Sequence, residues 1–134
     1  MVFSRIKNET TLKLLRVYRQ WVMAWLIIIL ALASSPSPKV ELIYAAPDRE
    51  HILYAAEFDA LARTAPSLSY ETVIAPAEKI YDRLFDLAQA RWVAADTDRT
   101  RHFYICGVGK GVIRLRDLLR GAGYERRSVH YEQW

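Results

Sequence analysis

The sequence is poor in cysteine: Cys106 is the only one among 134 residues. A single thiol excludes an internal disulfide framework, and it also excludes an iron–sulfur cluster bound by this chain alone. Cysteine and histidine pairs at zinc-ligand spacing are lacking as well, and no cluster of acidic residues predicts a metal site. The sequence therefore indicates neither a disulfide-stabilised nor a metal-dependent protein.

Common catalytic and nucleic-acid motifs are also missing. The sequence contains neither the GxSxG of α/β-hydrolases nor a Walker A motif, and its histidines have no evident serine or cysteine partner except Cys106. The formal net charge is +4, but the basic residues are scattered and no RNP-like aromatic motif is present. We therefore predict no nucleic-acid partner. The charged segment over residues 94–101 is interpreted as a solvated loop.

A hydrophobic run long enough to span a membrane is lacking, although a shorter run is present. Residues 21–33, WVMAWLIIILALA, are about 13 apolar residues, whereas a spanning helix needs ~20. A basic start precedes the run and a Ser/Pro linker follows it. A membrane-inserted helix, a cleaved signal peptide and a buried segment of the fold all remain open. We treat residues 1–38 as a separate segment and expect a protein that is cytoplasmic or membrane-associated through residues 21–33.

Residues 39–134 alternate between strand patterns and helix patterns. Asp48 is placed to cap the first helix, and Gly121 to end the last one. The alternation predicts an α/β fold, a partial Rossmann-like parallel sheet of about four strands and three helices, preceded by an apolar N-terminal helix. The predicted strands cover residues 40–46, 68–75, 102–106 and 126–134, and the predicted helices cover residues 49–63, 77–91 and 112–120.

Ligands of parallel sheets bind beyond the C-terminal ends of the strands, where the chain turns into the next helix. The predicted turns cover residues 46–50, 75–79 and 106–111. The third turn reads CGVGKG. Its glycines let backbone amides approach a ligand, and the N-terminus of the following helix favours an anion. Because the pattern is not GxGxxG, a turn that only packs helix on strand is an equal alternative. Cys106 is likewise either a packing residue or a chemical one.

Longer stretches of the C-terminal region match a known family. FYICGVGKGVIRLRDLLRGAGY followed by VHYEQW resembles the end of the ferredoxin–NADP reductases, flavoproteins that pass electrons between a nicotinamide nucleotide, FAD and a partner. In that family one strand ends in Cys-Gly, and the last strand finishes with Glu, any residue and an aromatic. Cys106-Gly107 and Glu132-Gln133-Trp134 match these places, and Lys79-Ile80-Tyr81 matches a Lys-x-Tyr that contacts the adenosine of NADP. The resemblance covers residues 40–134.

The resemblance implies a role for each matching residue. Cys106 would lie beside the nicotinamide ring, Glu132 would belong to the polar network around it, and Trp134 would stack on the flavin. Tyr81 would stack on adenine, with Lys79 beside it. Separately from the resemblance, the glycine-rich turn itself makes Gly107 and Gly109 candidates for binding the nucleotide. The implied cofactor is NAD or NADP, because the Ser and Arg that grip the 2′-phosphate have no match in Ala75-Pro76-Ala77.

The chain departs from the family in its first third. No counterpart of the flavin-binding barrel or of the first strand and its GTGxxP turn is present. We therefore expect residues 39–134 to be the NAD(P)H-binding portion of a ferredoxin–NADP reductase-like oxidoreductase, which transfers hydride between nicotinamide and FAD. FAD would be supplied by a missing or partner domain, and the chain would not be active alone. The expected partners are the nicotinamide nucleotide and a flavin-domain or electron-transfer protein. Two alternatives remain: a non-enzymatic, membrane-tethered interaction module of the same fold, and an unrelated α/β domain with Cys106 in its core.

Overall fold

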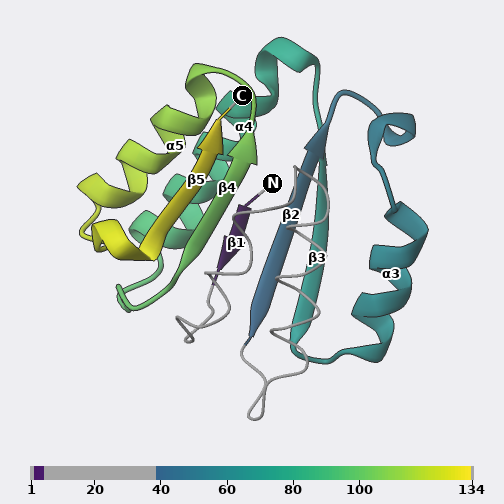
Figure 1. Ribbon diagram of the computed structural model, residues 1–134, viewed down its shortest axis with the longest axis horizontal. Helices are drawn as coiled ribbons and strands as arrows, with labels where there is room; N and C mark the ends of the chain where they lie inside the picture. Colours follow the sequence, from purple (N-terminus) through teal and green to yellow (C-terminus); the bar gives the residue numbers. More distant parts are fainter. Residues whose placement is uncertain (1, 5–38, 134) are drawn as a thin grey trace.

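The computed structural model describes residues 2–4 and 39–133, which form a mixed sheet packed against helices (Figure 1). The strand order is β3-β2-β1-β4-β5. β2 pairs with β3 in parallel, and so does β4 with β5, whereas β1 runs antiparallel to β2 and β4. The partial Rossmann-like fold is confirmed. The strands cover Val2–Ser4 (β1), Val40–Ala46 (β2), Leu68–Ile74 (β3), Phe103–Gly107 (β4) and Val129–Gln133 (β5).

The short central strand β1 corrects the expected number of strands from about four to five in the described part of the chain. Val2 pairs with Ile43 on one side and with Ile105 on the other, so that three residues join the two parallel strand pairs. A segment of three residues is too short to show an alternating pattern, and the sequence therefore gave no sign of it. The predicted helix over residues 21–33 lies outside the described residues.

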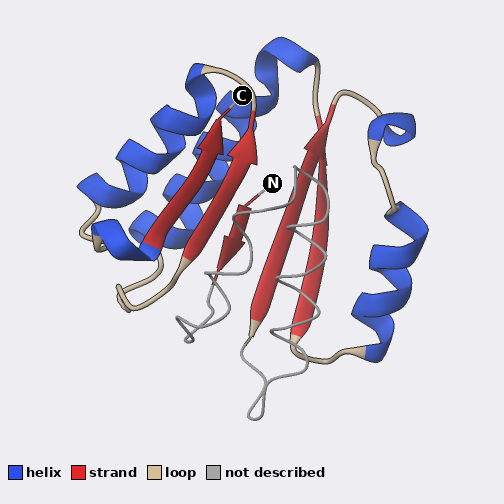
Figure 2. Cartoon of the chain, viewed as in Figure 1, coloured by secondary structure: helices blue, strands red, loops and turns tan. Residues whose placement is uncertain are grey.

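The two faces of the sheet bury separate apolar clusters, because successive strand residues point to opposite sides. On one face, Leu42 and Tyr44 pack with Phe58 of α3. On the other face, Ile43 and Phe103 pack with residues of α4 and α5. Figure 2 shows α4 and α5 beside β4 and β5, and α3 beside β3 at the other edge. These helices cover Ala55–Thr64 (α3), Ile80–Ala88 (α4) and Lys110–Gly121 (α5).

The first helix begins later than predicted. Asp48 caps only a 3-10 turn, Arg49–His51, where its side chain accepts a hydrogen bond of 3.1 Å from the His51 N–H. The α-helix starts after Tyr54, whose φ of 59° lies in the left-handed region. A tyrosine rarely adopts this conformation, so the periodicity of residues 49–63 gave no reason to expect the break.

The second helix continues further than predicted. A 3-10 turn, Ala77–Lys79, leads into α4, which runs on as a π-helix over Gln89–Ala94. The wider π-helical turn places Trp92 in the core, where its side chain is 1% exposed and its ring lies 5.2 Å from that of Phe103. Residues 77–94 thus cover the α5 side of the sheet without a break.

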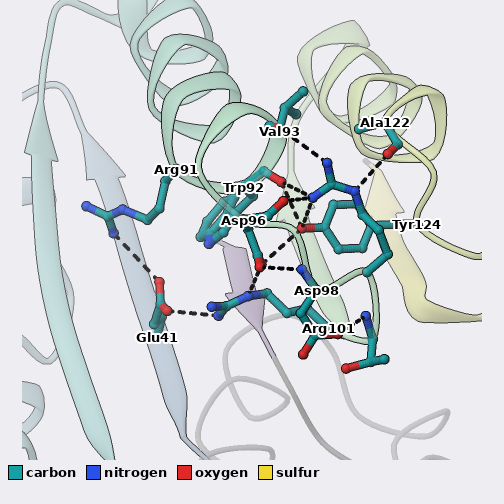
Figure 3. Close-up of polar contacts among 11 residues, drawn as sticks. Glu41, Arg91, Trp92, Val93, Asp96, Asp98, Arg101, Ala122 and Tyr124 are labelled. Atoms are coloured by element: carbon teal, nitrogen blue, oxygen red, sulfur yellow. Dashed lines mark hydrogen bonds and ion pairs between the residues drawn. The ribbon is translucent and has the colours of Figure 1, made fainter.

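The connection from the π-helix to β4 is held by charged side chains, which corrects its interpretation as a solvated loop. Arg99 is partly buried and donates to the carbonyl oxygens of Trp92 (3.0 Å), Val93 (3.0 Å) and Ala122 (2.9 Å). Figure 3 shows these acceptors together with Asp96, whose carboxylate accepts from Arg101 and from the Tyr124 hydroxyl. The loop is therefore a structural joint at the N-terminal end of β4.

Candidate functional site

The parallel pairing of β4 with β5 places two of the predicted site residues side by side. Cys106 and Glu132 are direct register partners, and Gly107 pairs with Gln133 one step further along. Because the two strands run in the same direction, their C-terminal ends lie side by side at the same end of the sheet (Figure 1). The thiol and the carboxyl group therefore belong to one face of the sheet, at the edge where such folds bind ligands.

Both groups are partly buried, and burial sets their protonation. Burial raises the pKa of the Cys106 thiol above its ordinary value of 9.0, and the negative charge of Glu132 raises it further. Burial also raises the pKa of Glu132 above 4.5. At neutral pH Cys106 is thus a neutral, polarizable thiol rather than a thiolate nucleophile. This chemistry suits a residue that packs against a ligand better than one that forms a covalent bond.

Alkylation of Cys106 is expected to be slow at pH 7 and to accelerate with pH. Because only the thiolate reacts, the iodoacetamide rate should rise about tenfold per pH unit between pH 7 and pH 9, without levelling off. Glu132→Gln removes the nearby negative charge and should raise the rate about twofold at each pH, the size of a partly screened interaction. Mass spectrometry of the intact chain over time measures both rates.

The matched control for this experiment is Glu57→Gln, which removes an exposed carboxylate in the first turn of α3. It should leave the alkylation rate unchanged. A rate that levels off below pH 8, or that is the same with and without Glu132, would contradict the described environment of the thiol.

The glycine turn after Cys106 is occupied by the side chain of Tyr81. Its hydroxyl donates to the Val108 carbonyl oxygen (2.9 Å) and accepts from the Val108 N–H (3.0 Å). A methyl group at Gly107 or Gly111 would overlap the Tyr81 side chain, so both positions admit only glycine in this arrangement. Gly109 has a φ of 73° and no atom close to where a side chain would stand. The turn is therefore shaped by Tyr81 from α4 and is open only at Gly109.

The remaining predicted site residues are distributed around this turn. Lys79 is exposed at the end of the 3-10 turn that precedes α4. Tyr81 lies two residues later and contacts the turn with its ring, while its predicted stacking on adenine stays a prediction. Trp134 lies outside the described residues. The structure thus brings together Cys106, Glu132 and the glycine turn with Tyr81.

The same face of β4 and β5 carries a row of rings that the sequence analysis did not assign to the site. The His130 ring stacks on Tyr104 at 4.6 Å and lies 6.0 Å from His102. Burial lowers the pKa of both histidines, and neighbouring positive charges lower it further. Alternate positions on two paired strands would have revealed the row, had the register been known. The row ends at Cys106 and Glu132, and its histidines are neutral at pH 7.

The described part of the chain shows neither a metal cluster nor a membrane-spanning helix. Among residues 2–4 and 39–133, no group of three or more His, Cys, Asp or Glu residues could hold a metal ion. Within the same ranges, no helix is both long and apolar enough to cross a membrane.

The fold and this site define the class of protein: a partial Rossmann-like α/β chain with a cysteine–glutamate pair at the C-terminal ends of its last two strands. The chain is similar to "Ferredoxin--NADP reductase B" of Sorangium cellulosum (strain So ce56), with 29% identity over 101 residues. The match covers 69% of this chain and 41% of that protein. It supports a relationship to the ferredoxin–NADP reductases at the level of the family.

The chain spans less than half the length of this relative. No protein-family model and no solved structure matches the chain.

Proposed function

We propose that the chain is the NAD(P)H-binding portion of a ferredoxin–NADP reductase-like oxidoreductase and acts together with a flavin domain. The observation that carries the proposal is the register pairing of Cys106 with Glu132 at the strand ends. The family resemblance assigns both residues to the surroundings of the nicotinamide ring, although 26 positions separate them in the sequence. The similarity to a reductase over 69% of the chain supports the same conclusion.

The described residues fit a nicotinamide at this edge of the sheet. The neutral thiol of Cys106 is small and polarizable, so it can lie against a flat ring without competing for the reacting carbon. Burial raises the pKa of Glu132, and its carboxyl group can accept a hydrogen bond from the N–H of a carboxamide. When bound, the nicotinamide and the flavin supply the hydride transfer, and the protein supplies position and environment.

The glycine turn fits the nucleotide less completely. Gly109 is open and has the backbone conformation that glycine favours, so its amide can approach a ligand. Gly107 and Gly111 are covered by Tyr81. We therefore expect the nucleotide to be held by contacts at Gly109, Lys79 and the exposed part of Tyr81, with weak binding in the absence of a partner.

The test is reconstitution with the separately produced, FAD-loaded flavin domain of a ferredoxin–NADP reductase. Under anaerobic conditions, NADPH or NADH should bleach the flavin absorbance in the mixture but not in either component alone. Cys106→Ala should lower this rate about tenfold, equivalent to ~1.4 kcal/mol of lost transition-state positioning. Cys106→Ser keeps a side chain of similar size and should lose less. Stopped-flow absorbance measures each rate.

Glu57→Gln on α3, far along the sheet from β4, serves as the matched control and should reduce the flavin at the wild-type rate. If a folded chain gives no flavin reduction with NADH or NADPH, the proposal is wrong. That result would favour the non-enzymatic interaction module. Equal rates of flavin reduction for Cys106→Ala and the wild type would show that Cys106 does not contribute to the site.

A further inference from the structure

A cavity of about 180 Å³ lies between the start of α3 and strand β3, at the opposite edge of the sheet from β5. The proposed nicotinamide site at the ends of β4 and β5 does not use it. Four of the residues that line it are polar and two are apolar: Arg49, Asp59, Tyr70, Thr72, Ile52 and Ala55.

The polar side chains that line the cavity form no ion pairs or side-chain hydrogen bonds with one another among the described residues. Within residues 39–133, neither the Arg49 guanidinium nor the Asp59 carboxylate forms an ion pair or a side-chain hydrogen bond, and the Thr72 hydroxyl has no side-chain hydrogen bond either. The hydroxyl oxygen of Tyr70 is shielded from solvent and has no hydrogen-bond partner among the described residues. Two opposite charges therefore face one cavity without neutralising each other.

The charges of Arg49 and Asp59 lie at different positions along the direction of β3. Thr72 and Tyr70 occupy alternate positions on the same face of β3, roughly 7 Å apart. Asp59 lies about one helical turn beyond Ala55, ~6 Å along α3. Burial and the nearby charge of Asp59 raise the pKa of Tyr70 to about 12, which places the carboxylate at the Tyr70 end. Arg49 follows β2 at the strand-end side, where Thr72 lies.

We propose that this cavity binds a small amino acid, with the carboxylate at Arg49 and Thr72 and the ammonium group at Asp59. Ile52 and Ala55 would cover the carbon chain between the two charges. At the packing density of protein interiors, ~0.74, the cavity accommodates roughly 130 Å³ of ligand atoms, enough for a molecule of a few carbons. The site goes beyond the proposed reductase function and does not depend on it.

The experiment titrates the ¹⁵N-labelled full chain with three probes that each have three carbons: β-alanine, propionate and propylamine. β-Alanine carries both charges and should shift the backbone amide signals of Ala55 and Thr72, with an affinity in the millimolar range because so small a ligand makes few contacts. Propionate and propylamine each lack one charge-assisted contact and should bind at least about tenfold more weakly.

Two variants and two matched controls assign the contacts. Arg49→Gln and Asp59→Asn should each weaken β-alanine binding at least about tenfold. Arg63→Gln and Glu57→Gln remove the same charges from α3 outside the cavity lining and should bind like the wild type. The amide spectrum of each variant shows whether it is folded.

Three results would each overturn the proposal. The first is the absence of saturable shifts at Ala55 and Thr72 at ~50 mM β-alanine, a concentration well above the millimolar range expected for so few contacts. The second is propionate or propylamine binding as tightly as β-alanine, which would show a single-charge site. The third is unchanged binding in folded Arg49→Gln and Asp59→Asn. None of these results bears on flavin reduction, so the two proposals fail independently.

Discussion

Gly111→Ala is expected to destabilise the protein by about 2–3 kcal/mol, the upper part of the range for an overpacked side chain. An added methyl group would overlap the Tyr81 ring, which is partly buried against the turn. The ring cannot move away without losing the two hydrogen bonds between its hydroxyl and Val108. The helical preference of alanine over glycine offsets only ~0.5–1 kcal/mol of this cost. Urea unfolding followed by circular dichroism measures the change.

The matched control for Gly111→Ala is Gly121→Ala at the end of α5. A methyl group at Gly121 meets no atom within 4 Å. This change should be neutral or should stabilise by up to ~1 kcal/mol, through the lower entropy of the unfolded chain.

A double mutant then shows whether the cost of Gly111→Ala comes from steric overlap with the Tyr81 ring. Tyr81→Ala removes the ring, so adding Gly111→Ala to it should cost almost nothing, giving a coupling energy of about 2 kcal/mol between the two positions. If Gly111→Ala costs the same with and without Tyr81, the ring does not cover the turn as described.

The link between Tyr81 and the turn explains why the sequence predicted the site only in part. The strand over residues 40–46 was predicted to the residue, because a β-rich run ends there at Pro47-Asp48. The glycines at 107, 109 and 111 indicated a turn for the same local reason. That Tyr81 would cover two of them depends on how α4 packs against α5, and no local pattern encodes this packing.

Register is the second feature that local patterns did not supply. Cys106 and Glu132 were grouped by a family resemblance, and their direct pairing follows from the parallel alignment of β4 with β5. The row of Tyr104, His130 and His102 follows from the same alignment, and it was missed because single strands do not reveal their partners. The cavity at β3 is lined by residues of three separate elements, whose packing no local pattern encodes either.

Arg99→Met is expected to destabilise the protein by about 3 kcal/mol, because hydrogen bonds from a charged donor contribute roughly 1.5–3 kcal/mol each and are not additive. Methionine keeps much of the apolar stem but removes the donor from the carbonyl oxygens of Val93 and Ala122, and it leaves the Trp92 carbonyl oxygen with the Tyr124 hydroxyl alone. These carbonyls belong to the π-helix and to the end of α5, so one side chain ties both to the start of β4. Thermal and urea unfolding measure the loss.

The geometry of the guanidinium predicts how two further variants behave. Arg99→Lys restores the charge but not the planar fork, and a single ammonium group cannot reach three carbonyls in different directions, so it should recover less than half of the lost stability. Arg83→Met removes an exposed arginine of α4 and should change stability by no more than ~0.5 kcal/mol. Full recovery by lysine would mean that charge alone matters at this joint. Because the Arg99 joint lies at the end of the sheet opposite Cys106, Arg99→Met should lower the unfolding free energy without changing the pH dependence of Cys106 alkylation in the folded chain.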